Sequence, residues 1–200
     1  MKRWILVCIS VLICIGTLMA SASATTIPTV GAQGAVLMEA ESGEILLDQN
    51  GDAQLPMAST TKIMTALVAL EHTKKLDQKV KVSEEAAGIE GSSIYLSAGE
   101  QLTMEQLLYA LMLESANDAA AAIACEVAGS VESFAALMNE KAKELGLTNT
   151  HFTNPHGLDN EAHYTCARDL ATLTCAALQN DTFRKIVSTY KHTIPLNGSE

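Results

Sequence analysis

The chain has 200 residues, 48% of them hydrophobic, and a formal net charge of −10 at pH 7. This length suits one domain, or one domain with part of a second, and it is enough to bury a core. Because the chain is acidic and has no basic run, we expect no binding to nucleic acid and no electrostatic attachment to an anionic membrane surface.

The N-terminal segment has the composition of an export signal. The cations Lys2-Arg3 precede an apolar run, Trp4–Met19, and small residues follow at Ala20–Ala24. This order is typical of a secretory signal peptide, and the run is short for a permanent membrane anchor, which is the alternative. We therefore predict that residues 1–24 are removed and that residues 25–200 reach the cell envelope outside the cytoplasm.

Three of the five cysteines, Cys125, Cys166 and Cys175, would remain after such cleavage. Their odd number and irregular spacing match neither a disulfide framework nor a zinc site, so we predict free, buried thiols. The histidines of the segment 151–163 also lack the spacing of metal ligands. We expect them to have structural roles, and no metal site is predicted.

Apolar periodicity and turn residues predict short strands early in the chain and helices after them. Residues 34–39 and 44–48 alternate around the turn Glu41–Gly43 and should form a hairpin. A third strand is predicted at 79–82, and residues 88–99 should form a loop. This order indicates an α+β fold whose sheet is incomplete within the chain. Helices are predicted at 59–72, from 83, at 103–113, 117–128, 130–145, 165–178 and from 181, before an edge strand or extended arm at 188–196.

Several polar side chains mark the ends of these elements. Thr103 and Gln106 have the spacing of a capping box. Thr165 is expected to cap the helix that follows it, and Asp118 to act as a cap or scaffold partner rather than as a general base. The adjacent charges of Arg168-Asp169 are expected to pair with each other.

The segment Ser59–Lys62 begins a helix whose apolar residues cover nearly its whole circumference, which indicates a buried helix. Positions i and i+3 are neighbours on a helix, so the Lys62 stem should lie beside the Ser59 hydroxyl. A serine nucleophile needs a base, and both burial and the positive end of the helix dipole lower the pKa of a lysine toward that role. The alternative is that Ser59 caps the helix and Lys62 extends its amine to solvent. A second Ser-x-x-Lys, Ser188–Lys191, lies in a segment expected to be extended, where such side chains diverge.

A second polar motif, Ser115-Ala116-Asn117, separates two apolar helices. The Ser115 hydroxyl can relay a proton between the lysine and a leaving group, and the Asn117 amide can hold Lys62 and donate to a substrate carbonyl. The alternative is that both residues cap helix ends. Ser-x-x-Lys followed by Ser-x-Asn makes up two of the three motifs of penicillin-binding proteins and β-lactamases, and the third, Lys-Thr-Gly, does not occur in this sequence.

Longer segments extend this similarity. From about Gly34 to its end, the chain resembles the low-molecular-weight penicillin-binding proteins that are serine D-alanyl-D-alanine carboxypeptidases of peptidase family S11. The resemblance implies a β-lactamase/transpeptidase-like α+β fold, with a helical cluster packed on an antiparallel sheet. The segments that carry it are Pro56–Thr65, Gly91–Leu96, Gly99–Thr103, Leu113–Ala120, Phe152–Leu158 and His163–Ala171.

The same resemblance implies an acyl-enzyme mechanism that removes the terminal D-alanine from peptidoglycan stem peptides. Ser59 would attack the carbonyl between the two D-alanines, Lys62 would accept its proton, and Ser115 would help to pass that proton to the leaving D-alanine. Asn117 would position lysine and substrate, and the Ser59 N–H would supply half of an oxyanion hole. Penicillin and other β-lactams would acylate the same serine, and no metal or organic cofactor is implied.

The missing Lys-Thr-Gly motif is the main departure from the family. There it lies on a strand that holds the substrate's carboxylate and provides the other oxyanion donor. Residues 25–200 are therefore expected to form a catalytic domain truncated before that strand, as a fragment of a longer protein or a shortened product. Membrane association would depend on a C-terminal region absent from this chain. Two alternatives stay open: a β-lactamase-type hydrolase, for which no separate deacylating glutamate is evident, and an inert product or binding module.

Overall fold

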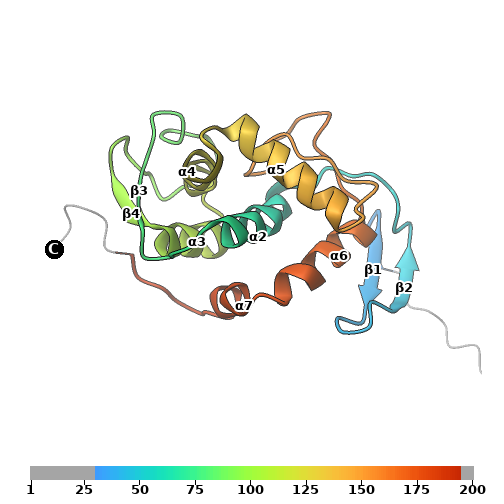
Figure 1. Ribbon diagram of the computed structural model, residues 1–200. Helices are drawn as coiled ribbons and strands as arrows, with labels where there is room; N and C mark the ends of the chain where they lie inside the picture. Colours follow the sequence, from blue (N-terminus) through green and yellow to red (C-terminus); the bar gives the residue numbers. More distant parts are fainter. Residues whose placement is uncertain (1–29, 195–200) are drawn as a thin grey trace, which may run out of the picture.

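The computed structural model describes residues 30–194, which form a cluster of helices with a two-stranded sheet at either end (Figure 1). The predicted signal peptide and the last residues of the predicted C-terminal arm lie outside the described residues. The elements in chain order are β1 Ala35–Met38, β2 Ile45–Gln49, the 3-10 turn η1 Ala58–Thr61, α2 Lys62–His72, β3 Lys79–Lys81, β4 Gln101–Thr103, α3 Met104–Leu113, α4 Asn117–Ala128, α5 Val131–Glu144, α6 Ala167–Leu178 and α7 Asp181–Val187.

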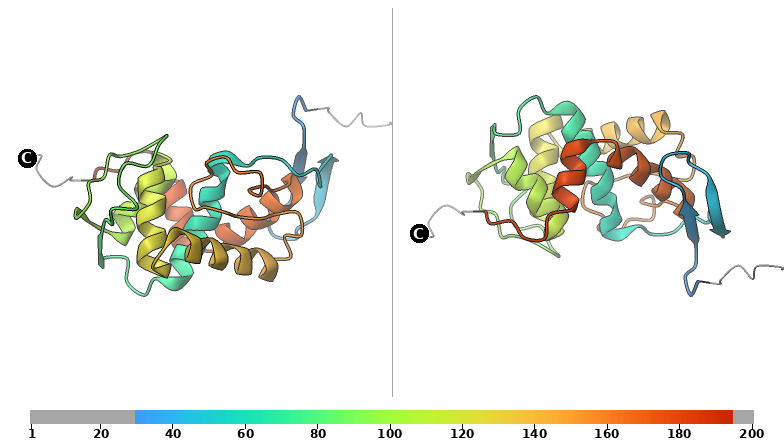
Figure 2. Two further views of the ribbon diagram at one scale, coloured as in Figure 1. Left: turned by 90° about the horizontal axis from the view of Figure 1, so that it is seen from above. Right: turned by 90° about the horizontal axis from the view of Figure 1, so that it is seen from below.

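Helix α2 lies at the centre of the cluster, where it packs against α3, α4, α5, α6 and α7 (Figure 2). Its side chains are buried on every side, and Met64, Val68 and Ala69 have no exposed surface at all (0%). The all-round apolar pattern predicted this burial, and the structure confirms it. Burying one large apolar side chain contributes about 1.5–3 kcal/mol, so α2 is a rigid support for the residues at its N-terminus.

Helix α4 is rich in alanine, and its small side chains let the neighbouring helices approach closely. Residues 119–124 are at most 1% exposed, and α4 packs against α2, α3 and α5. This packing brings the N-terminus of α4 to the N-terminus of α2. Among residues 30–194, no single helix is long and apolar enough to cross a membrane. Only α4 and α5 taken together reach that length and apolar character, and they are bent by 83° relative to each other.

The strands form two small antiparallel sheets. Ala35 of β1 lies opposite Gln49 of β2, with a register irregularity between Leu37 and Met38, and this is the predicted hairpin. Strand β3 pairs with β4, a strand of 3 residues that periodicity did not indicate because it runs directly into the capping box of α3. Helices packed with small antiparallel sheets confirm the predicted α+β class.

Two predictions about helix ends are wrong. Residues 84–88 form turns that finish at Gly88 instead of a helix, because so short a segment gains too few hydrogen bonds to offset nucleation. The cap of α6 is Cys166, whose Sγ accepts from the Asp169 N–H at 3.4 Å, while the Thr165 hydroxyl bonds with that of Thr150 at 2.7 Å. The capping box at Thr103–Gln106 is confirmed.

The adjacent charges of Arg168 and Asp169 do not pair with each other, which corrects the sequence-based expectation. Arg168 contacts the carboxylates of Asp48 and Asp52, at the end of the β1–β2 hairpin and just beyond it. Asp169 accepts from the Thr150 hydroxyl at 2.8 Å. Consecutive residues on a helix point in different directions, so each charge finds its partner on another segment.

The described cysteines are free, as predicted, but only Cys166 is buried, whereas Cys125 and Cys175 are partly exposed. The prediction of buried thiols therefore holds for one of them. In the C-terminal arm, the described part from 188 to 194 contains no strand, so the expected edge strand is not present there.

Candidate active site

Ser59 and Lys62 lie where the η1 turn leads into α2. The turn presents Ser59 at the surface, and Lys62 is the first residue of the helix. The Lys62 Nζ lies 3.1 Å from the Ser59 Oγ. The spacing of three positions therefore brings amine and hydroxyl together, as the helical geometry predicted.

The Lys62 amine is enclosed, with only 2% of the residue exposed. Besides its contact with Ser59, its Nζ donates to Asn117 Oδ1 at 2.8 Å and to the His156 carbonyl oxygen at 2.7 Å. These partners are uncharged, and no carboxylate among residues 30–194 hydrogen-bonds the amine. Burial without a counter-ion lowers the pKa of Lys62 to about 8. The alternative of an amine extended to solvent is therefore wrong.

Asn117 is held so that its carbonyl oxygen faces the lysine. Its Nδ2 donates to the Glu90 carbonyl at 2.7 Å, and its backbone N–H donates to the Ser92 carbonyl at 2.7 Å. With the amide nitrogen directed at Glu90, Oδ1 is left to accept from Lys62. Gly91, at φ +89°, passes so close that a Cβ there would lie 2.7 Å from Asn117 Nδ2. A side chain at that position would displace the amide.

Ser115 occupies the junction between α3 and α4. Its backbone is in the left-handed region, with φ of 55°, which is uncommon for a residue that carries a side chain. The residue is half-buried, two positions before Asn117, at the same end of α4. Within the described part of the chain, its hydroxyl makes no hydrogen bond with Ser59 or Lys62.

Asp118 fixes the loop that passes over Asn117. The carboxylate of this fully buried residue accepts from the Ser93 hydroxyl at 2.6 Å and from the backbone N–H groups of Leu96 at 2.9 Å and Ile94 at 3.3 Å. The expected role as a scaffold partner is confirmed. By holding this loop, Asp118 also holds the backbone carbonyls that orient Asn117.

The loop Asn154–Gly157 supplies one of the groups that hold Lys62, although we expected its histidine to have only a structural role. The Pro155 carbonyl accepts from the Thr65 hydroxyl at 2.6 Å, which docks the loop on α2 and directs the His156 carbonyl at the amine. Burial and the nearby lysine lower the pKa of the His156 ring to about 4, so it is neutral at pH 7. Proline and glycine are typical of a turn, but which carbonyl the turn presents to Lys62 depends on how the loop docks on α2.

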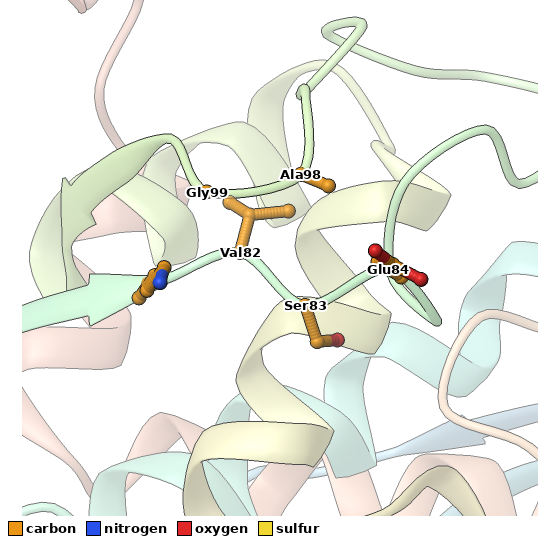
Figure 3. Close-up of a pocket in the computed structure, with 6 residues that line it drawn as sticks. Val82, Ser83, Glu84, Ala98 and Gly99 are labelled. Carbon is orange, nitrogen blue, oxygen red and sulfur yellow. The ribbon is translucent and has the colours of Figure 1, made fainter.

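A cavity of about 470 Å³ lies away from these residues, beside β3 and β4 (Figure 3). Its lining comes from Lys81–Glu84 and Ala98-Gly99, and includes none of the four predicted site residues. We therefore assign it no part in the chemistry. In the part of the chain that the structure describes, no cluster of His, Cys, Asp or Glu is arranged to hold a metal ion.

Comparison with known sequences points to one family. The sequence model of peptidase S11, described as D-alanyl-D-alanine carboxypeptidase, matches residues 20–199. The D-alanyl-D-alanine carboxypeptidase DacF of Bacillus subtilis (strain 168) is 42% identical over 164 residues, which cover 80% of this chain and 42% of DacF. The D-alanyl-D-alanine carboxypeptidase of Streptomyces sp. (strain K15) is 39% identical over 194 residues, covering 91% of this chain and 67% of that protein. The chain thus spans less than half the length of DacF.

Solved structures agree with this assignment. Penicillin binding protein 6B from Escherichia coli superposes with a TM-score of 0.81 at 31% identity, over 86% of this chain and 58% of that one. The Streptomyces K15 DD-transpeptidase superposes with a TM-score of 0.77 at 39% identity, over 82% of this chain and 67% of that one. This chain belongs to the peptidase S11 family of D-alanyl-D-alanine carboxypeptidases.

Proposed function

We propose that this chain carries the acyl-transfer residues of a serine D-alanyl-D-alanine carboxypeptidase, which shortens peptidoglycan stem peptides and is acylated by penicillin. The observation that carries the proposal is the buried Lys62 amine, 3.1 Å from the Ser59 Oγ and otherwise bonded only to uncharged oxygens. The names of the relatives support the substrate class.

The geometry around Lys62 suits a base that takes a proton from Ser59. A neutral amine has two hydrogens and one lone pair, and Asn117 Oδ1 and the His156 carbonyl can only accept. They take both hydrogens at 2.8 and 2.7 Å, which leaves the lone pair directed at the Ser59 hydroxyl. In the ammonium form a third hydrogen occupies that direction and the base is lost. The lowered pKa of Lys62, about 8, keeps a useful fraction of the amine neutral at pH 7.

We assign the remaining steps to the residues for which the family resemblance implies them. As the Ser59 Oγ bonds to the carbonyl carbon between the two D-alanines, its proton passes to Lys62, and the Ser59 N–H stabilises the oxyanion. Ser115, at the same end of α4, passes the proton to the D-alanine nitrogen as the C–N bond breaks. Asn117 holds Lys62 with Oδ1 and has a second amide hydrogen for the substrate. Water then hydrolyses the ester and releases the shortened peptide.

We further propose that residues 1–24 direct export and are removed, so that residues 25–200 act in the cell envelope. Peptidoglycan lies there, and trimming its stem peptides would contribute to cell-wall assembly and cell shape. The order of cations, apolar run and small residues supports this proposal. Sequencing the N-terminus of the exported chain should give Thr25 as its first residue. An intact N-terminus on the membrane would contradict cleavage.

Penicillin labelling of the 200-residue chain tests the proposed chemistry. After exposure to the drug, peptide mapping by mass spectrometry should find the adduct on Ser59, and Ser59→Ala should abolish it. Ser188→Ala is the matched control from the second Ser-x-x-Lys, where the Ser188 hydroxyl instead donates to the Lys185 carbonyl at 3.1 Å. That variant should label like the wild type.

The same experiment separates the alternatives. An unlabelled Ser59 would favour an inert product or binding module. An adduct that turns over rapidly would favour a β-lactamase, whereas a long-lived adduct together with release of D-alanine from a peptide ending in D-Ala-D-Ala supports the carboxypeptidase. Among residues 30–194, no carboxylate is hydrogen-bonded to the side chain of Ser59 or Lys62, so no deacylating base is evident there.

A further inference from the structure

A line of buried hydrogen bonds runs from His163 to the residue that precedes Ser59. His163 Nε2 lies 2.7 Å from Thr61 Oγ1, and Thr61 Oγ1 donates to the Ala58 carbonyl at 2.7 Å. His163 is 4% exposed and Thr61 is 0% exposed. On the opposite side of the ring, Nδ1 accepts from the Thr153 N–H at 3.0 Å. The line connects a distant loop to the η1 turn.

These contacts determine where the imidazole carries its hydrogen. A backbone N–H can only donate, so His163 Nδ1 is the unprotonated acceptor toward Thr153. Burial lowers the pKa of His163 to about 4, and the ring is neutral at pH 7. Its one hydrogen is therefore on Nε2 and is donated to Thr61 Oγ1. The Thr61 hydroxyl then gives its own hydrogen to Ala58, so that each donor in the line meets an acceptor.

The Ala58 carbonyl and the Ser59 N–H belong to one planar peptide unit. They point in opposite directions, so a hydrogen bond that orients the carbonyl also orients the N–H. Ala58 has a φ of 46°, in the left-handed region, and persists there only because its surroundings hold it. Gly157 packs against the same carbonyl, where a Cβ would lie 1.9 Å from the Ala58 oxygen.

We propose that His163 is a positioning residue for acyl transfer, which acts through Thr61 to hold the Ala58–Ser59 peptide unit in the orientation that the oxyanion requires. This inference rests on the proposed function of Ser59. His163 makes no hydrogen bond to the side chain of Ser59 or Lys62 and is not a base for either. The connected hydrogen bonds also polarise the peptide unit and strengthen the Ser59 N–H as a donor.

Two substitutions separate the two sides of the imidazole. Glutamine reaches as far as Nε2, so His163→Gln keeps a donor for Thr61 and loses the acceptor for Thr153. Asparagine reaches only as far as Nδ1, so His163→Asn keeps the acceptor for Thr153 and loses the donor for Thr61. Thr61→Val removes the hydroxyl at nearly constant volume. Because each His163 variant loses one hydrogen bond, a role confined to stability would affect both variants alike.

Acylation of Ser59 by penicillin, measured on the full chain, gives a saturating rate and a half-saturating concentration. We expect His163→Asn and Thr61→Val to lower the saturating rate by about tenfold or more at a similar half-saturating concentration, since the misplaced donor matters mainly in the transition state. His163→Gln should restore the rate to within about threefold of the wild type. The double variant His163→Asn/Thr61→Val should be no slower than either single variant. Equal rates for the Asn and Gln variants, or additive losses, would overturn the proposal.

Amide hydrogen exchange in the unacylated chain tests the positioning role independently of the chemistry. The N–H groups of Thr60 and Lys62 close the η1 turn. They should exchange faster in His163→Asn and Thr61→Val than in His163→Gln and the wild type. A wild-type chain that penicillin fails to label at Ser59 contradicts the proposed function, and exchange then decides the positioning role. Exchange that is unchanged in every variant contradicts the positioning role, whatever the labelling shows.

Discussion

Lys62 and Asn117 stand 55 positions apart in the sequence and are joined by a buried hydrogen bond of 2.8 Å from Nζ to Oδ1. The contact forms because α2 and α4 pack together and their N-termini meet. The partner of the amine is an amide dipole and not a charge. It therefore orients the lysine without strongly favouring the ammonium form, which is what a base requires.

The acylation rate should depend on the protonation of Lys62. With the pKa of Lys62 lowered to about 8, we expect the rate to rise with pH through that value and then level off, because only the neutral amine accepts the Ser59 proton. The measurement is the penicillin acylation rate as a function of pH. Lys62→Arg, whose guanidinium stays charged, should be slower by about 10²–10⁴-fold throughout. A flat profile in the wild type would contradict the role of Lys62 as base.

Asn117→Asp replaces the dipole with a charge of nearly the same shape. A carboxylate 2.8 Å from the amine favours the ammonium, so the pKa of Lys62 should rise. We expect the midpoint of the acylation profile to move to higher pH and the rate at neutral pH to fall. The penicillin acylation rate as a function of pH measures this midpoint, and the plateau of the rate at high pH is the internal control. A midpoint at the wild-type position would show that Asn117 does not govern the charge of Lys62.

Lys62 should also make the stability of the fold depend on pH. Its pKa is about 8 in the folded chain, while the pKa of a lysine in the unfolded chain is about 10.4. Between these values the unfolded chain binds more protons, so the free energy of unfolding should increase as the pH rises through this interval. Lys62→Met lacks this contribution. The difference in unfolding free energy between wild type and Lys62→Met should therefore grow with pH and then level off, and denaturant titrations at several pH values measure it. A constant difference would be inconsistent with a buried, neutralised amine.

Gly157→Ala should damage the site by crowding Ala58 and Thr61. The added Cβ would lie 1.9 Å from the Ala58 carbonyl oxygen, so we expect a loss of about 1–3 kcal/mol from overpacking and a large loss of acylation rate. Gly129→Ala is the matched control, because Gly129 has a similar φ of +83° but open space around its Cβ position. Gly129→Ala should lose only the stability that a side chain costs at a positive φ, and its acylation rate should stay at the wild-type value. Equal losses of stability and rate in the two variants would contradict this account.

Asp118→Asn should loosen the loop that orients Asn117. Asn has one acceptor oxygen, so an NH₂ group would face a donor among the Ser93 hydroxyl and the N–H groups of Leu96 and Ile94. We expect a loss of about 1.5–3 kcal/mol, since these bonds are made to a charged group, and faster amide exchange at residues 94–96. Ser93→Ala removes one of these contacts and should cost less. Similar stability of Asp118→Asn and the wild type would show that the Asp118 carboxylate does not hold this loop.

Local sequence pattern alone predicted many structural features of this protein. The all-round apolar character of 59–72 predicted the buried helix, and the spacing of Ser59 and Lys62 predicted their contact, because one helical turn brings such positions together whatever surrounds it. The hairpin, the capping box and the bounds of α4 were evident for the same reason. Each of these features is governed by interactions between residues close in the sequence.

Only the tertiary structure decided what surrounds the amine. The His156 carbonyl, the docking of Pro155 on Thr65 and the bond between His163 and Thr61 join segments about a hundred residues apart. The first two use backbone carbonyls, which carry no sequence signature, and the third joins two side chains that only packing brings together. The partners of Arg168 were unpredictable for the same reason. The chain thus specifies its serine and lysine locally, but burial and the choice of partner, which determine whether that lysine is neutral, arise when distant segments pack together.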